Sequence, residues 1–214
     1  NTITFGSDPL SINKKISNKT KMIIAQHSFG IPCDIENIKN IASKNKIFLL
    51  EDCALTLGSK INNKTCGNFG DAALFSTDHT KLLNTLTGGL IYTKNKSLYK
   101  QLKISQNEAL PLSYKKKKML LKQFLFEHKY YNPKNYAKTR LLSAFKKRLE
   151  PSYNPFLNDE FGTKKISNYP FPSKLPIFLS YIGLLEVENW ELNIKNRLKI
   201  SKVLVSTLSN ILGH

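Results

Sequence analysis

Cysteine is scarce in this sequence. The three cysteines, Cys33, Cys53 and Cys66, form no Cys-x-x-Cys pair, and their number is odd. These features argue against a disulfide framework and against a structural zinc site, both of which need paired or closely spaced cysteines. Free thiols are typical of a reducing compartment, and we therefore expect the protein to be cytoplasmic.

Long apolar runs are absent as well. No run approaches the ~20 residues that a membrane-spanning helix needs. The opening residues, NTITFGSDPL, have neither the basic nor the apolar part of a signal peptide. The sequence also lacks an initial methionine, and we expect it to be a piece of a longer protein.

Arginine is rare although the chain is strongly basic. There are 33 Lys and Arg against 15 Asp and Glu, a formal net charge of +18, yet only Arg140, Arg148 and Arg197 are arginines. This charge would attract polyanions in general. Dedicated phosphate recognition favours the bidentate guanidinium, however, and no nucleic-acid-binding motif accompanies the lysines. We expect no nucleic-acid partner, and keep a basic module that binds nucleic acid or a membrane surface as an alternative function.

The sequence does contain short apolar runs typical of strands, and a segment whose apolar residues have helical spacing lies between two of them. Residues 21–26 and 46–52 have the length and composition of strands. Between them, residues 34–45 repeat isoleucines at helical spacing behind Asp34, a good N-cap. A strand–helix–strand unit makes parallel pairs, and residues 71–76 and 89–94 supply two further strands. The predicted fold class is α/β with a mostly parallel sheet.

Reactive side chains follow the ends of these predicted strands. Asp52 ends one strand and Ser76 another, Lys81 follows Ser76 by five residues, and the pair Gly88–Gly89 permits close backbone approach. In open α/β sheets, ligands bind beyond the carboxyl ends of the strands. Pyridoxal phosphate requires a lysine for a Schiff base and a carboxylate that keeps its ring nitrogen protonated. A lone lysine in so lysine-rich a chain is an ordinary surface residue. The prediction of a pyridoxal phosphate site therefore depends on the acid, the hydroxyl, the lysine and the glycine pair together.

Residues 27–93 resemble the central segment of the DegT/StrS family of nucleotide-sugar aminotransferases, which depend on pyridoxal phosphate. The shared elements are a His-x-x-Gly loop, a strand ending in Glu-Asp-x-Ala, a Gly-x-x-Gly-Asp connection, a Phe-Ser pair, the lysine and the Gly-Gly pair. The resemblance implies the large domain of PLP fold type I, followed by a helical region that leads toward the small domain.

The resemblance also implies residue roles and an activity. Lys81 is similar to the lysine that forms the Schiff base and moves the proton, Asp52 to the partner of the ring nitrogen, and Ser76 to the hydroxyl that binds the cofactor phosphate. The implied reaction transfers an amino group from an amino acid, glutamate in the family, to a nucleotide-linked keto-deoxysugar for cell-surface polysaccharide, in a homodimer. A dehydratase branch of the family carries His in place of the lysine, and Lys81 argues against that branch.

Two segments depart from the family pattern. Leu55 stands where the family has a Gln that contacts the cofactor's phenolic oxygen, and Pro172, Ser173 and Lys174 replace an Asn–aromatic–Arg sequence. In the family, the turn that binds the cofactor phosphate lies upstream of the position that corresponds to Asn1. Leu55 and the upstream position of that turn favour the alternative that the chain is a non-catalytic homologue or an inactive fragment, whereas the replaced Asn argues against a cofactor site shared between subunits.

Three segments are expected along the chain. Residues 1–103 would form the C-terminal part of the cofactor-binding large domain, 104–172 a basic helical and Pro-punctuated insertion, and 173–214 a long helix that leads into the small domain. The last helix is expected to break near Asn189.

The predicted insertion contains two helices, 115–131 and 135–149, both rich in lysine. The first has an apolar stripe that includes Leu120, Leu121 and Leu125. Such a stripe is more typical of a core than of a membrane surface, and we expect no membrane association.

Four other polar residues near the site have simpler interpretations. Glu51 is expected to lie behind the site or on the surface, and Cys53 to be buried. His27 is expected to have a structural role and His79 to stand where the family tolerates several residues, so neither is expected to act as an acid or base, although histidine titrates in a useful range.

Overall fold

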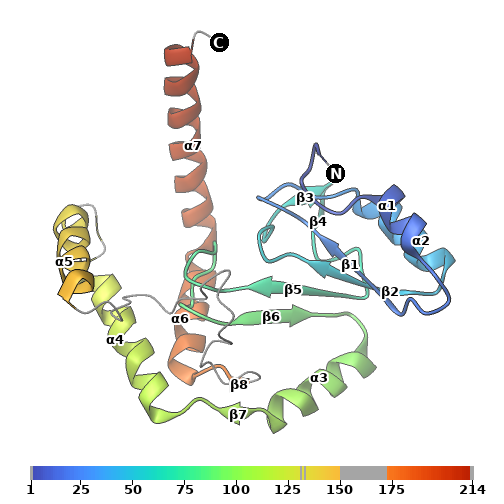
Figure 1. The fold of residues 1–214 in the computed structure, drawn as a ribbon, viewed down its shortest axis with the longest axis horizontal. Coiled ribbons are helices and arrows are strands. Elements are labelled where there is room, and N and C mark those ends of the chain that lie inside the picture. The colour runs from blue at the N-terminus through green and yellow to red at the C-terminus, as the bar shows by residue number, and fades with distance from the viewer. Residues whose placement is uncertain (1, 131, 133, 150–172, 213–214) are drawn as a thin grey trace. The chain divides into compact units, whose positions relative to one another are not determined.

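The computed structural model describes residues 2–130, 132, 134–149 and 173–212 (Figure 1). The chain divides into two compact units, Asn1–Lys103 with Ile177–His214, and Ile104–Pro176. The expected irregular structure of the Pro-punctuated stretch lies mostly outside the described residues, and the three-segment division given above stays a prediction.

The first unit contains a four-stranded sheet of β1 (Met22–Gln26), β2 (Phe48–Asp52), β5 (Ala72–Ser76) and β6 (Gly89–Tyr92). The strands lie side by side in the order β1-β2-β5-β6 (Figure 1). β1, β2 and β5 are parallel, whereas β6 runs antiparallel to β5. β6 reverses because the loop Thr77–Gly88 returns the chain directly, without a crossover helix. All four predicted strands and the α/β class are confirmed.

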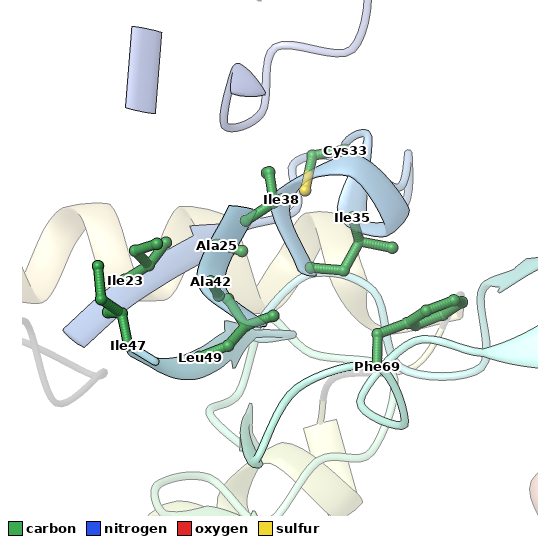
Figure 2. Close-up of a cluster of buried hydrophobic side chains, with 9 residues drawn as sticks. All are labelled: Ile23, Ala25, Cys33, Ile35, Ile38, Ala42, Ile47, Leu49 and Phe69. Carbon is green, nitrogen blue, oxygen red and sulfur yellow. The ribbon is translucent and has the colours of Figure 1, made fainter. Parts of the chain in front are cut away.

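Helix α2 (Ile35–Lys44) covers one face of this sheet. Asp34 caps it as predicted, since its Oδ1 accepts a hydrogen bond from the backbone N–H of Asn37 at 3.4 Å. A cluster of buried side chains lies between the helix and the sheet (Figure 2); it consists of Ile23, Ala25, Cys33, Ile35, Ile38, Ala42, Ile47, Leu49 and Phe69. Burying one isoleucine side chain stabilises a fold by about 1.5–3 kcal/mol, so this cluster accounts for much of the stability of the unit.

Three short elements of the first unit were not predicted. Helix α1 (Pro9–Lys15) begins after Asp8, whose Oδ2 accepts from the N–H of Ser11 at 2.8 Å. Strands β3 (Lys60–Ile61) and β4 (Lys64–Thr65) form a small antiparallel hairpin. Its turn residues both have positive φ, the conformation that two-residue hairpins require. Two-residue strands are too short to show an alternating pattern in the sequence.

The C-terminal helices of this unit are α6 (Ile177–Glu188) and α7 (Trp190–Leu212). They are separated at Asn189, so the predicted break is confirmed. The Asn189 side-chain amide donates to the backbone carbonyl of Leu185 at 2.9 Å.

The second unit contains α4 (Tyr114–Tyr130), α5 (Tyr136–Leu149) and the parallel pair of β7 (Leu110–Pro111) with β8 (Ser173–Lys174). Helix α3 (Lys96–Glu108) extends across the limit between the units. The two helices predicted within the insertion are confirmed. The core interpretation of the α4 stripe holds for Leu120, which is fully buried, but not for its exposed neighbours, which are Leu121 and Leu125. No helix in the described ranges is long and apolar enough to cross a membrane.

Candidate functional site

Asp52 and Ser76 lie on the same face of the sheet, at the carboxyl ends of β2 and β5. In the parallel pairing, Asp52 is opposite Leu74, and Ser76 follows Leu74 by two residues. Side chains of registered residues in parallel strands point to the same face, and so do residues two apart in one strand. Both side chains are half-buried. The structure therefore brings together these two predicted residues at the edge where α/β proteins bind ligands.

The Asp52 carboxylate is held in a fixed orientation. Its Oδ1 accepts a hydrogen bond from the backbone N–H of Ala54 at 3.0 Å. Across the described ranges, no other hydrogen bond to this carboxylate is formed, which leaves Oδ2 for a ligand. An oriented carboxylate with one unused oxygen has the geometry needed to bind a cationic ring nitrogen.

Lys81 lies in the loop Thr77–Gly88, which leaves β5 directly after Ser76. The loop is braced by the hydroxyl of Thr85, whose Oγ1 lies 2.7 Å from Oγ1 of Thr77 and 3.1 Å from its carbonyl oxygen. The backbone N–H of Lys81 donates to the carbonyl oxygen of Asp78 at 2.9 Å. Lys81 is thus half-buried on an ordered loop rather than on a helix or strand.

Glu51 precedes Asp52 and points to the opposite, covered face of the sheet, where it is fully buried. Its Oε1 accepts backbone N–H bonds from Phe69 and Gly70, both at 2.6 Å, and its Oε2 accepts one from Gly67 at 2.7 Å. His27 Nε2 also lies 3.4 Å from Oε2. Glu51 therefore anchors the connection before β5, and the surface alternative is wrong.

These contacts determine the charge of Glu51. Burial acts to raise the pKa of this carboxyl, but the hydrogen bonds from His27 and from the three backbone N–H groups together outweigh burial and lower the pKa. Glu51 is consequently ionised at neutral pH although water does not reach it.

His27 is oriented by two bonds. Its Nδ1 accepts the backbone N–H of Cys33 at 3.0 Å, so in the neutral ring the proton is on Nε2, which faces Glu51. His27 thereby ties the loop after β1 to Glu51. This fully paired, buried position supports the structural interpretation of His27. His79 lies in the site loop instead, with Nδ1 2.6 Å from Oδ1 of Asp78.

His27, Glu51 and Cys53 offer potential metal-ligand atoms within 4.8 Å of one another. The geometry does not suit a metal, because N–H donors already occupy both oxygens of Glu51 and the proton of His27 points inward. Burial, followed by the charge of Glu51, raises the pKa of the Cys53 thiol, and the protonated thiol is a poor ligand. Burial also raises the pKa of Cys33 to about 12 and that of Cys66 to about 11, and all three cysteines are free thiols.

The anchoring role of Glu51 was not foreseen from the sequence. The sequence contained two signals for it. The first is that adjacent residues in a strand point to opposite faces of the sheet, so only one of Glu51 and Asp52 can face a ligand on the open face. The closely spaced Gly67 and Gly70 also indicate backbone approaching an acceptor, as φ of 93° at Gly67 now illustrates.

We expect Gly70→Ala to destabilise the protein by about 1–3 kcal/mol, the usual cost of overpacking. A Cβ at this position would lie 2.6 Å from the carbonyl oxygen of Leu49 and 3.2 Å from that of Ala72, and backbone atoms cannot move aside without breaking the contact to Glu51. Urea unfolding followed by circular dichroism measures the change. An unchanged midpoint would show that this connection is not tightly held.

Comparison with known proteins gives relatives that include a nucleotide-sugar synthase and a nucleotide-sugar transaminase. The GDP-perosamine synthase of Escherichia coli O157:H7 is 44% identical over 88 residues, which are 41% of this chain and 24% of that protein. The dTDP-3-amino-3,6-dideoxy-alpha-D-galactopyranose transaminase of Aneurinibacillus thermoaerophilus is 40% identical over 105 residues, which are 49% of this chain and 29% of that protein. The chain thus spans about a quarter of the length of the curated relatives it matches.

Solved structures share the fold over more of the chain. The E. coli GDP-4-keto-6-deoxy-D-mannose-3-dehydratase with bound hydrated PLP matches with a TM-score of 0.60 at 21% identity, covering 94% of this chain and 44% of that one. An aminotransferase from Psychrobacter cryohalolentis matches with a TM-score of 0.57 at 18% identity, covering 88% and 38%. At these identities the likeness concerns the fold alone.

The sequence profile of the DegT/DnrJ/EryC1/StrS aminotransferase family matches residues 1–129, which include the whole sheet and the loop that carries Lys81. This match extends over more than half of the chain. The protein belongs to the DegT/DnrJ/EryC1/StrS aminotransferase family.

Proposed function

We propose that the protein transfers an amino group from an amino acid, with glutamate as the donor, to the keto carbon of a nucleotide-linked deoxysugar, using pyridoxal phosphate. The observation that carries this proposal is the common face of Asp52 and Ser76 at the carboxyl ends of neighbouring parallel strands, with Lys81 in the loop that follows Ser76. Membership of the family supports the same reaction class.

The residues at this edge fit pyridoxal phosphate. When bound, the cofactor supplies an electron sink that stabilises a carbanion on the substrate. Asp52 would hold its ring nitrogen through the carboxylate oxygen that is not bonded to Ala54, and Ser76 would donate its hydroxyl proton to the phosphate. Lys81 would bind the cofactor covalently through Nζ and then move the substrate proton as a general base.

The acceptor class is inferred from the relatives. Their names refer to GDP- and dTDP-linked sugars, and two of the most similar ones are a perosamine synthase and a sugar transaminase. We accordingly propose a nucleotide-linked keto sugar as the acceptor, with a cytoplasmic homodimer as the working form. Amino sugars of this kind serve as building blocks of cell-surface polysaccharide.

The direct test is a coupled assay on the protein. Purified protein is mixed with pyridoxal phosphate, glutamate and GDP-4-keto-6-deoxy-D-mannose, or a dTDP-linked keto sugar, and formation of 2-oxoglutarate and of the amino sugar is followed. Equal amounts of both products are expected. Loss of the sugar 3-hydroxyl without net amino transfer would assign dehydration instead, and cofactor binding without any turnover would assign the alternative, a non-catalytic homologue or an inactive fragment.

Asp52→Asn should lower turnover on the order of 10²–10³-fold, the usual effect of removing one electrostatic stabiliser of the transition state. Asn preserves the size and the bond to Ala54 but cannot neutralise a protonated ring nitrogen. The matched control is Asp34→Asn at the N-cap of α2, where Asn caps equally well and activity should not change. Near-normal transfer by Asp52→Asn would remove Asp52 from the proposed mechanism.

A further inference from the structure

Helix α5 presents an exposed apolar row. Leu141, Leu142, Phe145 and Leu149 are between 61% and 72% exposed. At ~100° per residue they lie within an arc of about 100° on one side of the helix. Large aliphatic side chains this exposed, and gathered on one helical face, mark an interaction surface rather than scattered surface residues.

Basic side chains accompany this row. Lys138 falls within the same arc and Arg148 at its edge, and both are exposed. The positions i, i+3 and i+4 on a helix are neighbours, so the ammonium and guanidinium groups flank the apolar row instead of lying opposite it.

Helix α4, shown with α5 in Figure 1, repeats the arrangement. Its exposed face carries the apolar side chains Leu121 and Leu125, and Lys118, Lys122 and Lys129 are exposed beside them on the same side. The fully buried Leu120 projects from another side, which turns the basic apolar face outward.

The charge of this segment exceeds the general lysine bias of the chain. Residues 114–149 contain 12 basic residues and one acidic residue, Glu127, whereas the whole chain has 33 basic and 15 acidic residues. This excess of positive charge, part of which lies beside two exposed apolar rows, calls for a partner that is both negatively charged and apolar.

We propose that the basic apolar faces of α4 and α5 bind the surface of an anionic lipid bilayer. Basic side chains would contact the headgroups, and the apolar rows would enter the boundary with the acyl chains, without crossing the membrane. Nucleic acid fits less well, because exposed leucines gain nothing from phosphates and only Arg140 and Arg148 among these basic residues offer a guanidinium. This inference is independent of the proposed enzymatic function.

The test is sedimentation of the full protein with vesicles of phosphatidylglycerol and phosphatidylcholine, compared with vesicles of phosphatidylcholine alone. Binding to the anionic vesicles is expected, and it should weaken as salt rises because the headgroup attraction is screened. Equal binding to both kinds of vesicle, or no binding to either, would overturn the proposal. So would binding to a DNA duplex with no binding to anionic vesicles.

Two variants assign the surface. Leu142→Glu/Phe145→Glu places carboxylates on the apolar row and should lower vesicle affinity at least tenfold. Lys138→Gln/Arg148→Gln should lower it by about 25-fold, since each basic residue near an anionic surface contributes about a factor of five.

The controls are matched substitutions on α3. Ile104→Glu replaces an exposed aliphatic residue of a helix, as the apolar variant of α5 does. Lys96→Gln/Lys100→Gln removes two exposed lysines, as the charge variant removes two basic residues. Both controls should bind as the parent does, and thermal unfolding verifies that every variant is folded. If the charge variant of α5 binds as tightly as the parent, or if the α3 controls lose binding equally, the assignment to α5 is wrong.

Discussion

Replacing Lys81 by Ala should abolish amino transfer, with a loss of turnover on the order of 10⁴-fold. Lys81 is the one lysine in the loop between β5 and β6, and it lies beyond the strand ends that carry Asp52 and Ser76. In the proposed function its amine forms the covalent link to the cofactor and moves the proton, so both would be lost, and a positioned general base contributes about 10²–10⁴-fold by itself. Lys81→Arg should be equally inactive, because a guanidinium keeps the charge but neither condenses with an aldehyde nor gives up its proton.

The measurement combines turnover with chemical trapping. Borohydride reduction of the protein with its cofactor, followed by peptide mapping, should find the added mass on Lys81 alone. The matched control is Lys100→Ala, an exposed lysine of α3, which should retain full activity and the same labelled peptide. A label on another lysine would refute the assignment of Lys81 even if amino transfer itself is detected, so the two proposals can fail separately.

Glu51→Gln should destabilise the protein by about 3 kcal/mol, although Glu51 lies on the covered face of the sheet and not in the proposed substrate site. The amide replaces one carboxylate oxygen by an NH₂ group, which then faces a backbone N–H donor such as that of Gly67, and the buried charge that three N–H groups stabilise is removed. A hydrogen bond to a charged group typically contributes about 1.5–3 kcal/mol, and an unsatisfied buried donor costs about 1–3 kcal/mol. The control is Glu36→Gln in the first turn of α2, an exposed acid whose loss should cost less than about 1 kcal/mol.

The same interaction gives stability a pH dependence of known sign. The pKa of Glu51 is lowered in the folded protein, so its contribution is fully present above the ordinary Glu pKa of about 4.3 and is lost as the pH falls through the lower, folded value. Urea unfolding at a series of pH values from neutral to acid should therefore show a fall in the free energy of unfolding below about pH 4.3, and a shallower fall in Glu51→Gln. Parallel curves for parent and variant would mean that Glu51 is not the ionised anchor.

Local signals in the sequence determined the framework of the first unit. Strand-length apolar runs and the isoleucine period behind Asp34 located β1, α2 and β2, because alternation and helical spacing are properties of neighbouring residues. Residue order also placed Asp52 and Ser76 at strand ends, and the parallel pairing then required them to share an edge of the sheet. The short hairpin of β3 and β4 escaped prediction because two residues carry no period.

What only the tertiary structure decided depends on residues far apart in the chain. Glu51 became an anchor because the N–H groups of Gly67, Phe69 and Gly70 converge on it, and no local pattern in the sequence encodes that convergence. The apolar rows of α4 and α5 have the spacing of core helices, yet their leucines are largely exposed, because helical spacing reports which residues share a face and not whether another element covers it. Periodicity is fixed by adjacent side chains along the backbone, whereas burial is fixed by whatever the rest of the fold brings against them.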